Sequence, residues 1–127
     1  MNKQLILVAE DEPAYGKILR NTLEKEGYKV VVTLNGEDLL KIAKTFYSAL
    51  VILDLIMPIK NGFQVLAEMK KNKHLEKIPI IALSNLGQDE DIEKAKKLGA
   101  DDYVIKSDET FYQVINKIKE LVANPRK

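Results

Sequence analysis

The sequence predicts an α/β domain built on a five-stranded parallel sheet in the order 2-1-3-4-5, with helices on both faces. Five short apolar runs rich in β-branched residues alternate along the chain with five segments whose apolar residues recur every three or four positions. Strands separated by helices pair in parallel, and a parallel sheet needs helices over both of its faces. The 127 residues suffice for one such domain and are too few for two.

Helices and turns follow the strands in a regular order. The first helix starts near Pro13, which suits a first helical turn, and Gly27 marks its end. Asn-Gly pairs at 35–36 and 61–62 each precede a helical pattern, so we expect strand-to-helix turns there rather than hairpins. Gly99 ends the fourth helix. The strands are expected at Leu5–Ala9, Lys29–Thr33, Leu50–Leu53, Ile78–Leu83 and Asp102–Ile105.

The overall charge is nearly balanced, with 20 basic and 19 acidic side chains and a net charge of +1. This balance gives no general attraction to nucleic acid or to a membrane surface. No apolar stretch approaches the roughly 20 residues of a membrane helix, and no secretion signal precedes the first strand. The absence of cysteine excludes disulfides and thiolate chemistry. We therefore expect a cytoplasmic protein that binds neither nucleic acid directly nor a membrane.

Polar side chains stand where the expected strands end. Glu10 and Asp11 follow the first strand and Asp54 follows the third. In this strand order the winding direction switches between those two strands, which is where ligands of such sheets bind. Ser84 and Lys106 end the fourth and fifth strands. The fold thus predicts a shared pocket of three acids, a hydroxyl and an ammonium.

These groups suit phosphoryl transfer. Clustered carboxylates repel one another unless a cation lies between them, and Mg²⁺ prefers oxygen ligands and is often bound together with a phosphate. Transfer itself needs in-line positioning and neutralisation of charge, which a metal ion and a lysine supply. A carboxylate can act as the nucleophile and form an aspartyl-phosphate.

The chain resembles the receiver domains of two-component response regulators, which have a flavodoxin-like fold. The match runs nearly end to end, and its motifs are highly specific when taken together. The chain is expected to be a single-domain, chemotaxis-regulator-like receiver over residues 1–127, or the receiver segment cut from a larger regulator. Its initial methionine and its end just past the last helix favour the stand-alone protein. The residues that carry the resemblance are Glu10, Asp11, Asp54, Met57, Pro58, Gly62, Ser84 and Lys106.

The resemblance implies a magnesium-dependent phosphoacceptor. Asp54 would accept a phosphoryl group from a sensor histidine kinase or a histidine phosphotransfer protein. Asp11 and Asp54 would ligate Mg²⁺ directly, together with the backbone carbonyl of Ile56, and Glu10 would act through water. The protein would modify only itself at Asp54, by phosphorylation and autodephosphorylation, and so would not be an enzyme in the usual sense.

Signal output is also implied by the resemblance. Ser84 would hydrogen-bond the phosphoryl group, Lys106 would pair with Asp54 and then with the phosphate, and Tyr103 would move inward as the switch aromatic. The face of the fourth helix, fifth strand and fifth helix would then contact an unknown downstream protein. The molecule would be a monomer or a phosphorylation-dependent dimer.

Three rival functions share parts of this pattern. A phosphatase resembling the haloacid dehalogenases needs a second acid two residues after its nucleophile, where Ile56 stands here. A flavodoxin-like FMN carrier needs a first loop that attracts phosphate, whereas Glu10 to Glu12 would repel it. The third rival, a receiver-like docking module that acts without phosphorylation, stays open.

Some neighbouring residues are placed outside the site. Glu12 is assigned to the helix that follows, where an acid in the first turn favours the helix dipole. His74 is expected to be a solvated loop residue. Receivers commonly carry a cis-proline after the lysine, but Ser107 stands there, so Ser107 or Asp108 is expected to cap the last helix.

Overall fold

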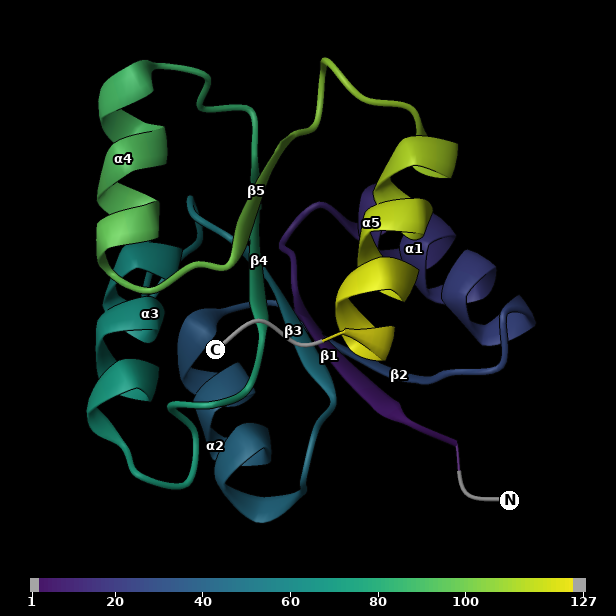
Figure 1. Ribbon diagram of the computed structural model, residues 1–127, viewed down its shortest axis with the longest axis horizontal. Coiled ribbons are helices and arrows are strands. Elements are labelled where there is room, and N and C mark those ends of the chain that lie inside the picture. The colour runs from purple at the N-terminus through teal and green to yellow at the C-terminus, as the bar shows by residue number, and fades with distance from the viewer. Residues whose placement is uncertain (1–2, 125–127) are drawn as a thin grey trace.

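The computed structural model describes residues 3–124. Ten elements alternate along the chain (Figure 1). The expected domain of residues 1–127 includes 1–2 and 125–127, which lie outside the described residues. The elements are β1 (Leu5–Ala9), α1 (Pro13–Lys25), β2 (Lys29–Thr33), α2 (Gly36–Thr45), β3 (Leu50–Asp54), α3 (Gly62–Lys71), β4 (Ile80–Ser84), α4 (Asp89–Lys97), β5 (Asp102–Ile105) and α5 (Phe111–Ala123).

The sheet has the predicted topology. All pairings are parallel and the strand order is β2-β1-β3-β4-β5. The register aligns the carboxyl ends: Asp54 stands opposite Leu83, and Ser84 stands opposite Ile105. The polar residues at the ends of four strands therefore reach the same edge of the sheet.

The two faces of the sheet carry separate cores. Helices α2, α3 and α4 cover one face, and α1 and α5 cover the other (Figure 1). The central strands β1 and β3 contribute alternate residues to each core, for instance Leu7 and Val51 to one and Ile6 and Ile52 to the other. Their side chains are fully buried, which explains why these strands are apolar at nearly every position.

The Asn-Gly pairs form strand-to-helix turns, as expected. Asn35 and Asn61 are the N-caps of α2 and α3, and the side chain of each accepts a hydrogen bond from a backbone amide of the first turn. Gly62 also allows a close approach: a Cβ there would lie 2.4 Å from the Asp54 carbonyl oxygen. The start of α3 is thereby held tightly against the end of β3.

Several boundaries differ from the sequence prediction. Strands β3 and β4 each extend one residue further than expected, to Asp54 and Ser84. Strand β4 begins at Ile80 rather than Ile78, because Pro79 has no amide hydrogen to give to a neighbouring strand. Helix α5 is capped by Thr110, which forms a capping box with Gln113. The expectation that Ser107 or Asp108 caps this helix is therefore wrong.

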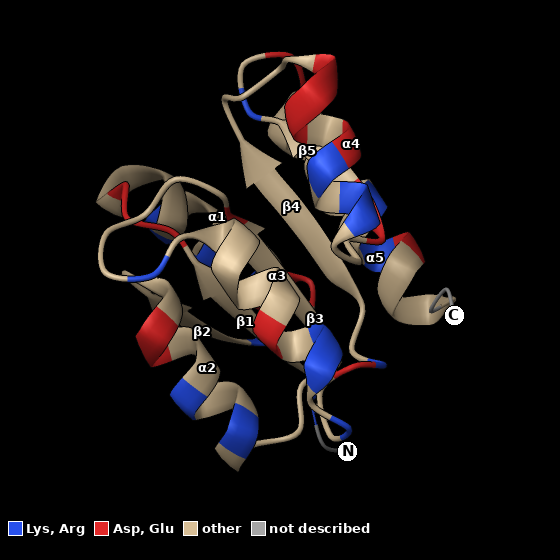
Figure 2. Ribbon diagram, turned by 90° about the vertical axis from the view of Figure 1, so that its left-hand side faces the viewer, with Lys and Arg blue, Asp and Glu red and all other residues tan. Residues whose placement is uncertain are grey.

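Charge follows the helix dipole most clearly in α4. Acids occupy its first turn and lysines its last turn, and the red and blue bands of Figure 2 show this division. The lysines are exposed. His74 in the loop between α3 and β4 is also exposed, so the expectation that it is a solvated loop residue is confirmed. Among residues 3–124, no helix is long and apolar enough to span a membrane. The α4 lysines are Lys94, Lys96 and Lys97.

Candidate functional site

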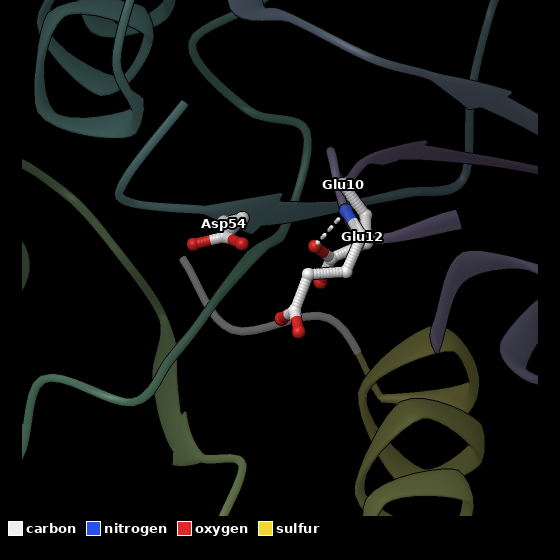
Figure 3. A group of neighbouring side chains, drawn as sticks. All are labelled: Glu10, Glu12 and Asp54. Atoms are coloured by element: carbon white, nitrogen blue, oxygen red, sulfur yellow. Dashed lines mark hydrogen bonds between the residues drawn. The ribbon is translucent and has the colours of Figure 1, made fainter. Parts of the chain in front are cut away.

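Three carboxylates meet at the carboxyl edge of the sheet, at the ends of β1 and β3 (Figure 3). Asp54 ends β3 and Glu10 directly follows β1, and they are only 5% and 0% exposed. Glu12 extends toward them from the start of α1, and one oxygen of each of the three groups lies within 4.8 Å of the others. The Glu12 amide donates a hydrogen bond of 2.9 Å to Glu10 Oε2.

One ammonium group balances this cluster. Lys106 follows β5, its side chain is 6% exposed, and its Nζ forms ion pairs with all three carboxylates. It donates to Glu12 Oε1 at 2.6 Å and to Asp54 Oδ2 at 3.1 Å. It also lies 4.7 Å from the centre of the Tyr15 ring, a cation–π contact that helps to fix its position.

Burial and the neighbouring charged groups have opposing effects on the pKa values of Glu10 and Lys106, and both pKa values end above their usual values. Burial raises the pKa of Glu10 to about 7, against the opposing effects of the Lys106 ammonium and the Glu12 amide. Burial would by itself lower the pKa of Lys106, but the nearby carboxylates, Glu10 first, outweigh it and hold that pKa above its usual value. Lys106 is therefore positively charged at neutral pH.

The carboxylates open into a cleft of about 320 Å³. Asp11 is exposed and lines this cleft, but among the described residues the group of three close carboxylates consists of Glu10, Glu12 and Asp54. Such a set of oxygen atoms can hold a divalent cation. Of the expected acidic ligands, the structure thus places Glu10 and Asp54 together and Asp11 at the rim.

The loop after β3 curls around the Asp54 carboxylate. The backbone amide of Ile56 donates to Asp54 Oδ1 at 3.0 Å, so the two oxygens of Asp54 have different partners. Further along the loop, Ile59 has a φ of +68°, which is uncommon for a β-branched residue. A hydrogen bond of 2.7 Å from the Lys60 amide to the Pro58 carbonyl closes this tight turn.

Ser84 and Tyr103 are linked through the backbone of Leu86. Ser84 is 2% exposed, and its Oγ accepts a hydrogen bond of 3.2 Å from the Leu86 amide. Tyr103 is 7% exposed, and its hydroxyl donates to the Leu86 carbonyl at 2.6 Å. The switch aromatic expected from the sequence therefore already points inward here.

Glu12 and Tyr15 belong to the surroundings of Lys106, although neither was placed in the site from the sequence. Glu12 is the N-cap residue of α1, yet its side chain makes no capping hydrogen bond and reaches Lys106 instead. Placing Glu12 only in the helix was therefore wrong. A third acid directly after Glu10 and Asp11 was the available signal, but the reach of a side chain across to β5 cannot be read from local sequence.

A comparison with known families agrees with this geometry. The family model described as "Response regulator receiver domain" matches residues 6–118. The chain belongs to the response regulator receiver family. The matched receiver segment runs from β1 into α5 and includes every residue of the acidic cluster and Lys106.

Curated relatives of this receiver domain are longer proteins. A "Probable transcriptional regulator ycf27" from Cyanophora paradoxa is 42% identical over 106 residues, covering 84% of this chain and 43% of the relative. "Transcriptional regulatory protein PcoR" from Escherichia coli is 33% identical over 123 residues, covering 97% of this chain and 53% of the relative. The receiver chain thus spans about half the length of these relatives.

Solved receiver structures share the fold over almost the whole chain. The signal receiver domain of a histidine kinase from Syntrophus aciditrophicus superposes with a TM-score of 0.86 at 26% identity, covering 98% of this chain and 93% of that one. The phosphorylated cyanobacterial phytochrome response regulator RcpA also gives 0.86 at 26% identity, covering 99% and 98%. The five-stranded sheet with helices on both faces is therefore the receiver fold.

Proposed function

We propose that the chain is a phosphoacceptor in two-component signal transduction. Asp54 takes a phosphoryl group from a phosphohistidine on a sensor histidine kinase or a histidine phosphotransfer protein. The observation that carries this proposal is a buried aspartate at the end of β3, Asp54, whose Oδ2 lies 3.1 Å from the ammonium of the buried Lys106. Membership of the receiver family supports it, and one similar regulator, RcpA, was solved in a phosphorylated form.

Each group of the cluster has a task in the transfer. A carboxylate oxygen of Asp54 attacks phosphorus, and the phosphorus–nitrogen bond breaks with its electron pair going to the imidazole, which takes up a proton. Lys106 neutralises part of the charge on the transferred group. Bound Mg²⁺ would supply further neutralisation and orient the phosphoryl oxygens. Glu10, Asp11, Asp54 and the Ile56 carbonyl would hold it, with Glu10 acting through water.

Ser84 and Tyr103 would carry the signal outward. The Ser84 hydroxyl would donate a hydrogen bond to a phosphoryl oxygen on Asp54, and its movement would disturb the hydrogen bond that Ser84 Oγ accepts from the Leu86 amide. Because the Leu86 carbonyl also accepts from Tyr103, movement of this loop would reach β5 and the neighbouring helices. The face formed by α4, β5 and α5 would then bind a downstream protein, as a monomer or as a phosphorylation-dependent dimer.

The proposal also covers the extent of the domain, its cellular location and the form of its output. Residues 1–127 would form one receiver domain that works in the cytoplasm. Its output would pass through protein contacts, without direct binding to nucleic acid or a membrane. Chemistry would be confined to phosphorylation and autodephosphorylation of Asp54, with no separate substrate turned over.

The test is the intact mass of the protein after treatment with acetyl phosphate, with and without Mg²⁺. We expect a gain of one phosphoryl group that needs Mg²⁺ and is absent in Asp54→Asn, which keeps the size of the side chain but lacks the nucleophile. The Asp11→Asn variant, altered at the rim, should gain it more slowly.

Failure to gain a phosphoryl group would have two distinct meanings. If the folded protein binds Mg²⁺ but resists acetyl phosphate, a histidine phosphotransfer protein must be tried as the donor. If it neither binds Mg²⁺ nor accepts a phosphoryl group from either donor, the phosphoacceptor role is wrong and a phosphorylation-independent docking module takes its place.

A further inference from the structure

We propose that Glu12 sets the phosphodonor selectivity of the site by disfavouring small, highly charged donors at the mouth of the cleft. This inference rests on the proposed function of Asp54 and concerns which donors reach it fastest. Glu12 would be a selectivity residue, since its charge acts on the approaching donor without taking part in the transfer.

The position of Glu12 fits such a role. Its side chain is 58% exposed, whereas those of Glu10 and Asp54 are 0% and 6% exposed. It lines the same cleft as Asp54 and Lys106. A donor that reaches Asp54 through this cleft comes close to the Glu12 carboxylate, because one oxygen of Glu12 lies within 4.8 Å of one oxygen of Asp54.

The Glu12 side chain has no evident structural task at the start of α1. It is the N-cap residue, but its carboxylate accepts no capping hydrogen bond, and Pro13 follows at the first helical position. Glu12 contributes to α1 through its backbone: its carbonyl accepts the first helical hydrogen bond, from the Gly16 amide, at 3.1 Å. Replacing only the carboxylate should therefore leave α1 in place.

The Glu12 carboxylate adds to an excess of negative charge in the cleft. Within this part of the described chain, Glu10, Glu12 and Asp54 pair with a single ammonium, that of Lys106, and Asp11 adds a fourth acid to the lining of the cleft. Glu12 adds negative charge where the donor enters and also draws the Lys106 ammonium to itself at 2.6 Å. Both effects weaken the attraction of the site for a phosphate dianion.

Two small donors of different charge separate this effect from others. With acetyl phosphate, a dianion, Asp54 attacks phosphorus, the bond to the acyl oxygen breaks and acetate leaves. With phosphoramidate, mainly a monoanion near neutral pH, the phosphorus–nitrogen bond breaks and ammonia leaves. Repulsion by Glu12 should be stronger for the dianion, and dissolved salt should screen it in both cases.

The experiment compares Glu12→Gln with the unaltered protein at saturating Mg²⁺. We expect Glu12→Gln to raise the rate with acetyl phosphate roughly fivefold at low salt, as for a unit charge and a dianion several ångströms apart across water. The gain should be smaller with phosphoramidate and should shrink toward none at about 1 M salt, where the screening length is only about 3 Å.

Two further variants identify the cause. Glu12→Asp keeps the charge and should stay close to the unaltered rate, even though its shorter side chain weakens the contact with Lys106. Glu109→Gln removes an acid that pairs with Lys117 and does not line the cleft. It controls for the change in net charge and should leave both rates unchanged.

Several outcomes would overturn the inference. An unchanged rate for Glu12→Gln, or an equal gain with both donors at every salt concentration, would show that its charge does not select the donor. A slower reaction with weaker Mg²⁺ binding would make Glu12 a metal ligand instead. If the unaltered protein accepts no phosphoryl group from either small donor or from a histidine phosphotransfer protein, the proposed function itself fails, and this inference with it.

Discussion

Lys106 is the residue on which the site depends most directly. Its ammonium is nearly buried and contacts Glu10, Glu12 and Asp54 at once. Taking charges out of water is costly, and the remaining charge of a broken buried pair has no solvent to stabilise it. The buried acids at the ends of β1 and β3 are thus tolerated because the end of β5 brings a cation to them.

Substitution of Lys106 should therefore destabilise the whole protein. We expect Lys106→Met, which keeps an unbranched apolar stem but removes the ammonium, to lower the free energy of unfolding by about 3 kcal/mol in buffer without Mg²⁺. Urea unfolding followed by circular dichroism measures this change.

A surface lysine provides the control for Lys106. Lys119 pairs with Glu26 at 2.9 Å, with both side chains well exposed, and such pairs contribute little to stability. Lys119→Met should leave the unfolding midpoint nearly unchanged. Equal losses in the two variants would show that burial of the Lys106 cluster carries no special weight.

At the scale of single elements, the start of α5 shows how a helix boundary is decided. The Thr110 hydroxyl accepts from the Gln113 amide at 3.1 Å, and the Gln113 side chain accepts from the Thr110 amide at 2.9 Å. Thr110→Ala should cost about 1 kcal/mol of unfolding free energy because it leaves an amide of the first turn without a partner. Thermal unfolding followed by circular dichroism measures this loss. Ser107→Ala and Asp108→Ala should cost much less in the same measurement, and a larger loss in either would place the cap there.

The same boundary shows what local sequence can and cannot predict. Apolar periodicity predicted every element in order, because each strand and helix must bury a face. The last residues of an element depend instead on which of several adjacent polar side chains finds a free amide. Ser107, Asp108 and Thr110 are all good caps by composition, and only the path of the chain after Lys106 selects Thr110.

At the scale of the whole molecule, the site is a consequence of strand order. Glu10 and Asp54 are far apart in sequence, and they meet because β1 and β3 are neighbours in the sheet. A known strand order therefore predicts the pairing of these acids from sequence. It does not predict which flexible side chain turns inward, which is why Asp11 lies at the rim and Glu12 reaches Lys106.

Because the acidic site exists only in the folded sheet, binding of Mg²⁺ there should stabilise the entire protein. A ligand that binds only the native state adds about 2.7 kcal/mol at one hundred times its dissociation constant, and for a chain of this length that raises the melting temperature by about ten degrees. Asp54→Asn should reduce the gain, since it removes a charged oxygen from the shared group. Thermal unfolding with MgCl₂, against NaCl at equal ionic strength, measures the effect. Equal melting temperatures in the two salts would mean that the three carboxylates do not form a cation site, and that Lys106 alone balances their charge.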